Sequence, residues 1–171
     1  MSPGYFVSAD IGELLVGAYL KVIEQCDVVA YNQRPPGGGM AGLGELDVIG
    51  LRFRDHTAIL CEVTTHIGGL TYGKSLTDTL QRIANKHLRQ RSYAESQLRD
   101  FPNRVYQFWA PRVPTGALTI GLAAVDADLE LIVNLEYTRR IDILRQEAAK
   151  RQNDEGNVAF RLLQILEALK R

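Results

Sequence analysis

Two short apolar runs, separated by only three residues, constrain the fold of this chain more than any other feature. Residues 45–53 (ELDVIGLRF) and 57–65 (TAILCEVTT) are rich in β-branched and aliphatic residues, and Arg54-Asp55-His56 lies between them. Runs of this length and composition predict strands, and so short a connection predicts that they pair in antiparallel fashion. The sequence therefore predicts a β-hairpin over residues 45–65.

Apolar periodicity and turn residues predict the other elements. The predicted order is one helix, three strands, one helix, one strand, a second hairpin and two helices. This order predicts an α/β fold with a mixed sheet and much antiparallel pairing early in the chain. Outside the first hairpin, helices are predicted over 10–25, 75–98, 136–151 and 158–169, and strands over 27–33, 105–110, 118–125 and 129–133.

Length and composition favour a single domain over residues 1–171. The chain is 46% hydrophobic and 23% charged, as in ordinary globular proteins, which excludes a disordered or collagen-like chain. No apolar run approaches the roughly 20 residues that cross a bilayer, so no membrane partner is expected. The first ten residues do not predict a signal peptide, and Cys26 and Cys61 fall at predicted buried positions. We therefore expect a cytoplasmic protein.

Acidic residues interrupt the two strands of the first hairpin. Glu45 and Asp47 fall on one face of their strand because side chains alternate, and Glu62 lies in an apolar run. In a hairpin, Asp47 and Glu62 fall close to cross-strand positions. Two neighbouring carboxylates repel unless a cation neutralises them, and oxygen ligands suit Mg²⁺ or Mn²⁺. The alternative is a surface-facing Asp47 and a Glu62 that pairs with an arginine such as Arg52.

The motifs around these acids resemble the PD-(D/E)xK nuclease superfamily, and more narrowly its small branch similar to Holliday-junction resolvases. That branch carries a Gly-Glu-(Ile/Leu)-Asp strand and then a Glu-Val-Lys strand, after a helix with a Gly-Glu pair and a later Tyr-Leu. The resemblance covers about residues 11–110. It implies a restriction-endonuclease-like αβββαβ core over about 10–112, with 113–171 as a C-terminal extension. The matching segments are Gly12-Glu13, Tyr19-Leu20, Asn32-Gln33-Arg34, Gly44-Glu45-Leu46-Asp47 and Glu62-Val63-Thr64.

This resemblance implies a metal-dependent endonuclease that hydrolyses DNA phosphodiester bonds. Asp47 and Glu62 would hold Mg²⁺ or Mn²⁺ together with the carbonyl of Val63, and Glu13 would approach from the first helix. The metal would polarise the phosphodiester and lower the pKa of a bound water.

One position departs from the family pattern. The family lysine, two residues after the second acid, is Thr64 here, and a hydroxyl supplies no positive charge. The family is known to let this lysine migrate, and Lys74 is then the nearest candidate for the catalytic lysine. The alternative is a catalytically degenerate module of the same fold that binds nucleic acid or assembles with other molecules.

Residues 68–75 (GGLTYGKS) match the phosphate-binding loop GxxxxGK[ST] between a predicted strand and a predicted helix. In such a loop the backbone N–H groups would hold phosphates and Ser75 would bind Mg²⁺. A nucleotide-binding protein that uses Gly68–Ser75 is therefore a second alternative. Polar residues in the preceding strand, and a best partner acid, Asp126, in a predicted hairpin turn, weigh against it.

Charge is unevenly distributed although the formal net charge is zero. Residues 1–70 carry four basic and eight acidic residues, whereas residues 71–112 carry eight basic and three acidic ones. Arg82, Lys86 and Arg89 form one stripe of a predicted helix, and we predict that they bind nucleic acid. The alternative is an ordinary solvated helix face.

Two further expectations concern the histidines and the end of the chain. The three histidines show no metal-ligand spacing with the two cysteines, so zinc is not expected, and His87 is predicted to pack on an apolar helix face. The last two helices either cover the sheet or form a homodimer interface.

Overall fold

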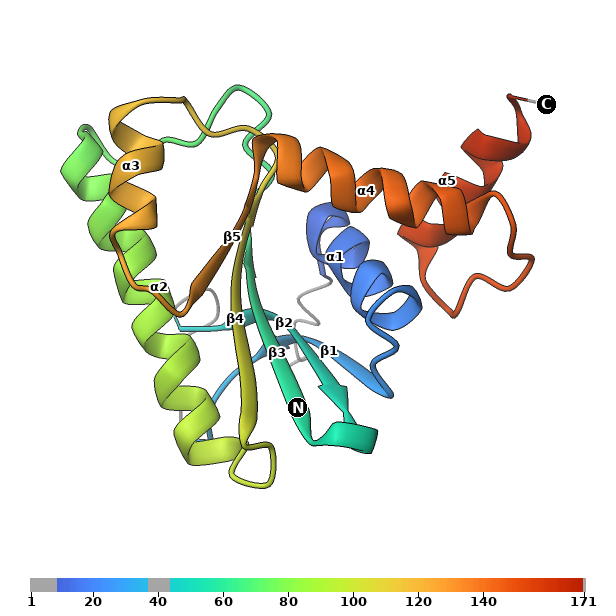
Figure 1. Ribbon diagram of the computed structural model, residues 1–171, viewed down its shortest axis with the longest axis horizontal. Coiled ribbons are helices and arrows are strands. Elements are labelled where there is room, and N and C mark those ends of the chain that lie inside the picture. Colours follow the sequence, from blue (N-terminus) through green and yellow to red (C-terminus); the bar gives the residue numbers. More distant parts are fainter. Residues whose placement is uncertain (1–8, 37–43, 171) are drawn as a thin grey trace, which may run out of the picture.

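The computed structural model describes residues 9–36 and 44–170. Their element order begins with the predicted αβββαβ core and continues with a helix, a strand and two helices (Figure 1). A single 3-10 turn, Phe53–Asp55, connects β2 to β3. The elements are α1 (Ile11–Val22), β1 (Val28–Gln33), β2 (Leu46–Arg52), β3 (Thr57–Val63), α2 (Leu76–Gln97), β4 (Asn103–Ala110), α3 (Ala117–Ala123), β5 (Leu129–Val133), α4 (Asn134–Ala148) and α5 (Val158–Ala168).

The five strands form one mixed sheet in the order β1-β2-β3-β4-β5. The pairs β1–β2 and β2–β3 are antiparallel, whereas β3–β4 and β4–β5 are parallel and are connected through α2 and α3. Figure 1 shows α2 and α3 on one face of the sheet and α1, α4 and α5 on the other. The predicted α/β class with a mixed sheet is confirmed.

The predicted second hairpin is wrong. Residues 117–123 form the helix α3, and β5 runs parallel to β4. A short apolar run does not distinguish a strand from a partly buried helix. Here Leu118 and Leu122, one helical turn apart, are buried, while Ile120 between them is 71% exposed.

Each face of the sheet has its own hydrophobic cluster because strand side chains alternate between the two faces. Cys61 and Trp109 pack under α1, α4 and α5, whereas Leu60 and Phe108 pack under α2 and α3. Both cysteines are buried and reduced. No helix in the two described ranges is long and apolar enough to cross a membrane.

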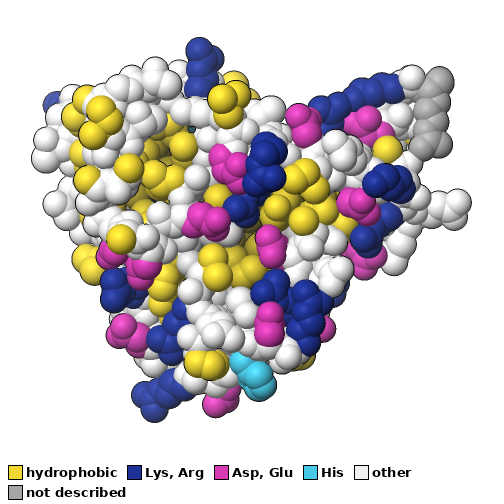
Figure 2. All heavy atoms as spheres, in the orientation of Figure 1, with side chains coloured by type: hydrophobic (Ala, Val, Ile, Leu, Met, Phe, Trp, Pro, Cys, Tyr) yellow, Lys and Arg dark blue, Asp and Glu magenta, His cyan; other side chains and the backbone are white. Residues whose placement is uncertain are grey.

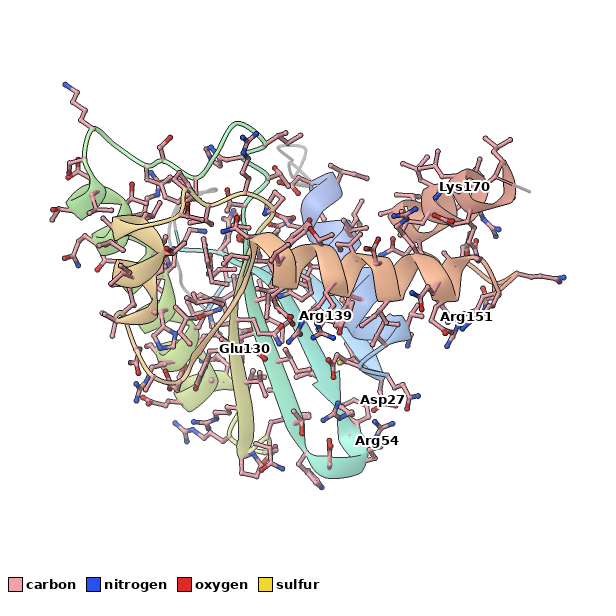
Figure 3. All side chains as sticks on the ribbon, turned by 45° about the horizontal axis from the view of Figure 1, so that its top comes forward. Asp27, Arg54, Glu130, Arg139, Arg151 and Lys170 are labelled. Atoms are coloured by element: carbon pink, nitrogen blue, oxygen red, sulfur yellow. The ribbon has the colours of Figure 1, made fainter. Side chains whose placement is uncertain are left out.

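The last two helices cover the sheet face that α1 also covers. Leu144 of α4 and Phe160 of α5 are fully buried in the same cluster as α1, and the Asn157 side chain donates to the carbonyl of Leu14. Figure 3 shows Arg151 and Lys170 at the far end of these helices, pointing away from the sheet. Apolar positions on the outer face of α5 and at its C-cap remain about half exposed or more, and a homodimer through this face stays a prediction. Those positions are Leu162, Ile165, Leu166 and Leu169.

Candidate active site

Asp47 and Glu62 lie on neighbouring strands of the β2–β3 hairpin. The antiparallel register places Val48 opposite Cys61, so Asp47 and Glu62 are the next facing pair along the same two strands. Alternation puts both side chains on the face that α2 covers, where Leu60 also packs. The side chain of Glu62 is 1% exposed and that of Asp47 is 15% exposed. The two acids therefore lie at the cross-strand positions that the hairpin predicts.

A single lysine from α2 lies against both acids. The Nζ atom of Lys86 is 2.5 Å from Glu62 Oε2 and 3.6 Å from Asp47 Oδ2. Asp47 Oδ2 also accepts a hydrogen bond of 2.7 Å from the backbone N–H of Val63, which brings the Val63 backbone to the same place. Hydrogen bonds between charged groups are short and strong, so this contact fixes the Lys86 side chain. The Lys86 ammonium group therefore contacts both carboxylates.

Negative charge at this site exceeds the positive charge that neutralises it. The second carboxylate oxygen of Glu62, Oε1, is buried without a hydrogen-bond partner. Burial, together with the charge of Asp47, raises the pKa of Glu62 to about 8 despite Lys86. Burial alone would lower the pKa of Lys86, but Glu62 and Asp47 outweigh it and the pKa is raised. Because both pKa values are raised, Glu62 and Lys86 bind their protons more tightly than usual. Excess negative charge at a site has this effect on nearby groups.

Glu13 is the third acid, and it comes near Asp47 from the first turn of α1. Its carboxylate accepts hydrogen bonds from the backbone N–H of Asp10 at 3.0 Å and from the Asn32 amide at 3.3 Å. Gly12 permits this approach, because a Cβ atom there would lie 2.1 Å from a side-chain carbon of Thr65. Burial, and then the charges of Asp10 and Asp47, raise the pKa of Glu13 to about 7. Glu13 therefore lies within electrostatic reach of Asp47.

Glu13 lies within electrostatic reach of Asp47, but Glu13, Asp47 and Glu62 are not a preformed three-ligand site. Among the described residues, only His87, Asp126 and Asp128 bring three ligand atoms within 4.8 Å of one another. The unpartnered Glu62 oxygen and the proton affinity of the cluster nevertheless fit a cation. Mg²⁺ is commonly held by one or two carboxylates and several waters, which matches two acids beside the Val63 backbone.

The lysine that contacts the acids is not the one the sequence suggested. Lys74 is exposed, and its backbone N–H bonds to Asp78. Ten helical residues, about 15 Å of helix, separate the start of α2 from Lys86. The signal that could have identified Lys86 is its spacing, three residues after the buried Ile83 and four before the buried Gln90.

The predicted basic stripe points toward the sheet over much of its length. Lys86 contacts the acids, and the Nε atom of Arg89 is buried without a hydrogen-bond partner. Arg82 is exposed, and its guanidinium lies 4.6 Å from the centre of the Tyr72 ring. A solvated helix face is therefore the wrong interpretation for Lys86, while nucleic-acid binding by the stripe remains a prediction.

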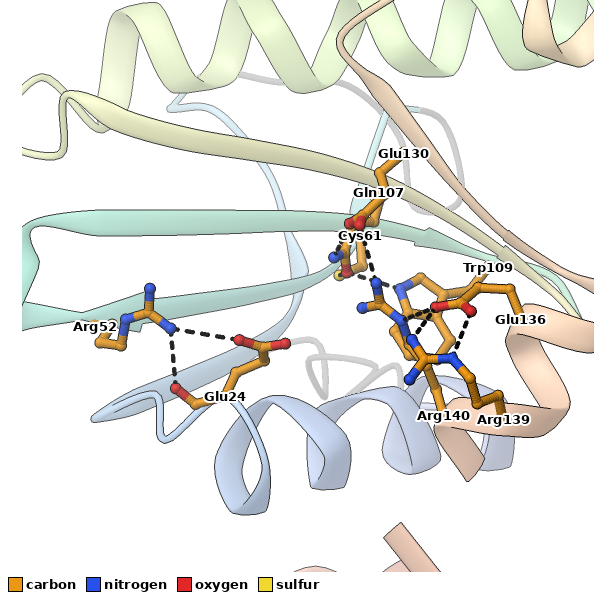
Figure 4. Close-up of polar contacts among 9 residues, drawn as sticks. All are labelled: Glu24, Arg52, Cys61, Gln107, Trp109, Glu130, Glu136, Arg139 and Arg140. Atoms are coloured by element: carbon orange, nitrogen blue, oxygen red, sulfur yellow. Dashed lines mark hydrogen bonds and ion pairs between the residues drawn. The ribbon is translucent and has the colours of Figure 1, made fainter. Parts of the chain in front are cut away.

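Two other sequence alternatives can be compared with the geometry. Arg52 bonds to Asp55, and also to Glu24 as Figure 4 shows, so the suggested pair between Arg52 and Glu62 is wrong. Thr64, at the position of the family lysine, has a buried hydroxyl without a hydrogen-bond partner.

The Gly68–Ser75 loop is not arranged to hold a phosphate. The backbone N–H of Lys74 donates to the Asp78 carboxylate, and the Ser75 hydroxyl accepts from the Asp78 N–H as the N-cap of α2. An acidic side chain therefore lies where a bound phosphate would be needed. Asp126 contacts His87 instead, about 18 Å along α2 from Ser75. This geometry gives the nucleotide-binding alternative no support.

Another charged cluster occupies the opposite face of the sheet (Figure 4). Arg140 of α4 donates to Glu130 at 2.9 Å and to Glu136 at 2.8 Å, and Gln107 donates to Glu130. Arg139 adds two further hydrogen bonds to Glu136. Figure 2 shows positive and negative side chains interleaved over this part of the surface. We call these five residues the Arg140 network.

No protein-family model matches the chain, and no curated protein or solved structure matches it. The resemblance to PD-(D/E)xK nucleases therefore depends on the motifs and on the geometry described above.

Proposed function

We propose that this chain is a metal-dependent nuclease that hydrolyses phosphodiester bonds in DNA. The observation that carries the proposal is the buried Asp47–Glu62 pair beneath a single lysine, with one carboxylate oxygen that has no partner. Asp47, Glu62 and the Val63 carbonyl would hold Mg²⁺ or Mn²⁺, because these ions prefer oxygen ligands. When bound, the metal would polarise the phosphodiester and lower the pKa of a bound water.

Lys86 takes the place of Lys74 in this proposal. Its ammonium group provides the charge and the N–H donors that Thr64 lacks, and it lies beside the acids that would bind the metal. A lysine on the covering helix can stabilise the charge that develops on the phosphate as well as one on the strand. With Lys86 as the source of positive charge, β3 has to provide only the metal-binding acid Glu62. A threonine at position 64 is then compatible with the proposed mechanism.

Glu13 contributes a third negative charge near Asp47. Asp10 and Asn32 donate hydrogen bonds to its carboxylate. With its pKa at about 7, Glu13 gains or loses a proton in the neutral range, as a general acid or base requires. We assign it a supporting role in proton transfer.

A polyanionic substrate fits the cations beside the acids. Arg82 is exposed on α2, and Arg89 has a buried Nε without a hydrogen-bond partner one turn after Lys86. Arginines so placed can contact the phosphates on either side of the cleaved bond. We therefore propose nucleic acid, and DNA in particular, as the substrate class.

Cleavage of a supercoiled plasmid and of a four-way DNA junction, with Mg²⁺ or Mn²⁺, tests the proposal. We expect Asp47→Asn and Glu62→Gln to lower the cleavage rate by about 1,000-fold or more, as for groups that act as a unit. Asp142→Asn, an exposed carboxylate on α4, is the matched control and should retain the wild-type rate. Circular dichroism checks that each variant is folded. Full activity in a folded Asp47→Asn or Glu62→Gln variant would contradict the proposal.

A catalytically inactive nucleic-acid-binding protein of the same fold is the second candidate. The short contact between Lys86 and Glu62, together with Thr64 at the family lysine position, favours it. This candidate predicts salt-dependent DNA binding that Arg82→Ala and Arg89→Ala weaken, without cleavage in any divalent metal. The two candidates therefore differ in one measurement, the appearance of cleaved product.

A further inference from the structure

His87 lies one residue after Lys86 but faces a different partner. Its Nε2 atom is 2.7 Å from Asp128 Oδ1 and 3.4 Å from Asp126 Oδ2, on the turn before β5. The imidazole ring is 2% exposed and packs edge-on against Tyr106, whereas the two aspartates are partly exposed. A buried nitrogen and two carboxylates thus meet at a place that solvent can reach.

Gln90 determines which nitrogen of His87 carries the proton. The Gln90 amide nitrogen donates to the carbonyls of Leu60 at 2.9 Å and Gln107 at 3.1 Å. A flipped amide would place its oxygen against both carbonyl oxygens, so the network fixes the amide orientation. The Gln90 oxygen then faces His87 Nδ1 at 3.2 Å and must accept a proton from it. Nδ1 of His87 is therefore the donor nitrogen.

When the His87 ring is neutral, its Nε2 atom is an acceptor, and the groups opposite it are also acceptors. With the proton on Nδ1, Nε2 carries a lone pair that is directed at the carboxylates of Asp128 and Asp126. Two acceptors at 2.7 Å repel each other unless a positive species lies between them. That species is either a second ring proton or a metal ion.

We propose that His87, Asp126 and Asp128 bind a divalent transition-metal ion such as Zn²⁺, Mn²⁺ or Co²⁺. One imidazole nitrogen and two carboxylates suit these ions better than Mg²⁺ or Ca²⁺, which prefer oxygen ligands alone. Histidines that bind metals almost always donate their other ring N–H to a fixed acceptor, the role that Gln90 has here. This site lies apart from the proposed catalytic acids and has a different donor set.

Solvent reaches the cluster through its two partly exposed aspartates. Arg91 bonds to Asp126 Oδ2 at 3.1 Å and lies 3.6 Å from Asp128 Oδ2, so it orients the carboxylates. The exposed sides of the two aspartates leave the remaining coordination positions to water. A bound ion would tie α2 to the turn before β5, two segments 41 residues apart at His87 and Asp128.

Titration of the metal-free protein with Co²⁺ and Zn²⁺ tests this site, because Co²⁺ coordination by nitrogen and oxygen gives a visible absorption signal. We expect one equivalent to bind more tightly than Mg²⁺ does. Asp128→Asn and Asp126→Asn, substitutions at partly exposed positions, should weaken binding by about tenfold to 100-fold or more. Asp142→Asn, at an acid that belongs to neither proposed metal site, should leave Co²⁺ binding unchanged.

Two results would overturn the metal site. The first is Co²⁺ and Zn²⁺ binding that Asp128→Asn and Asp126→Asn leave unchanged. The second is a ring of His87 that carries protons on both nitrogens in ¹⁵N spectra and does not respond to added metal. Neither readout depends on cleavage activity, so the outcome does not depend on the proposed nuclease function.

Discussion

The acids of the candidate active site and those of the Arg140 network have opposite electrostatic environments, although both lie against the same sheet. Glu62 is buried with Asp47 beside a single lysine, and its pKa is raised to about 8. Glu136 lies nearer the surface between Arg139 and Arg140, and their hydrogen bonds lower its pKa to about 2. The ratio of cations to acids and the degree of burial therefore decide the difference. The Arg140 network is electrostatically complete, whereas the active-site acids still require positive charge.

The largest effect is expected from removing the ammonium group of Lys86, the only one in residues 9–36 and 44–170 that contacts the active-site acids. Lys86→Met keeps the length of the side chain but removes the cation that contacts Asp47 and Glu62. Breaking a buried ion pair in this way costs about 3–5 kcal/mol of unfolding free energy. Denaturant unfolding at pH 8 measures the loss. Lys74→Met is the matched control, because Lys74 is exposed, and it should leave stability nearly unchanged.

If Lys86→Met were as stable as Lys74→Met, the acids would not depend on Lys86 for their charge balance. The double variant Lys86→Met with Glu62→Gln sharpens the test. Once Glu62 is neutral, the missing ammonium group should cost less than it does in the single variant.

The β2–β3 hairpin was predictable because its determinants are local. A three-residue connection fixes the register, so Asp47 and Glu62 fall opposite each other, and alternation then puts them on one face. The αβββαβ order follows in the same way from runs whose period is readable within ten or twenty residues. Neither inference needs any contact between distant segments.

The lysine, the second hairpin and the histidine site could not be predicted because they depend on tertiary packing. Lys86 meets Glu62 only because α2 crosses the sheet at a particular place, 24 residues later in the chain. Residues 117–123 become a helix because they connect two parallel strands, which no local pattern shows. His87 and Asp128 come together across 41 residues.

The pH dependence of stability should differ in sign between the two charged clusters. Glu62 keeps its proton up to about pH 8 in the folded chain, whereas an unfolded glutamate loses it near its ordinary pKa of 4.5. The unfolded state therefore binds fewer protons between these values, and stability falls as pH rises through that window. For Glu136 the folded pKa of about 2 is the lower one, so its contribution is lost as pH falls from 4.5 toward 2.

Glu62→Gln and Glu136→Gln separate these contributions. Glu62→Gln should flatten the decline between pH 4.5 and 8 and raise stability at pH 8.5 by on the order of 2 kcal/mol. Glu136→Gln should lower stability above pH 4.5, and its difference from wild type should shrink as pH falls toward 2. Chemical denaturation across pH 3–9 measures both. If the wild-type protein is as stable at pH 8.5 as at pH 6 without metal, the active-site acids carry no excess charge.

The smallest effect is expected at Glu13, which lies at the edge of the acidic cluster and is half-buried. Its folded pKa of about 7 exceeds the unfolded value of 4.5, so its ionisation destabilises the fold as pH rises from 4.5 to 7. Solvent screening reduces this contribution to about 1 kcal/mol or less. Glu13→Gln should therefore be slightly more stable than wild type at pH 8, and equal to it at pH 4. Because the Asp47 charge contributes to this shift, Asp47→Asn should lower the pKa of Glu13 in an NMR titration. An unchanged Glu13 pKa in Asp47→Asn would mean that Glu13 and Asp47 do not belong to one electrostatic unit.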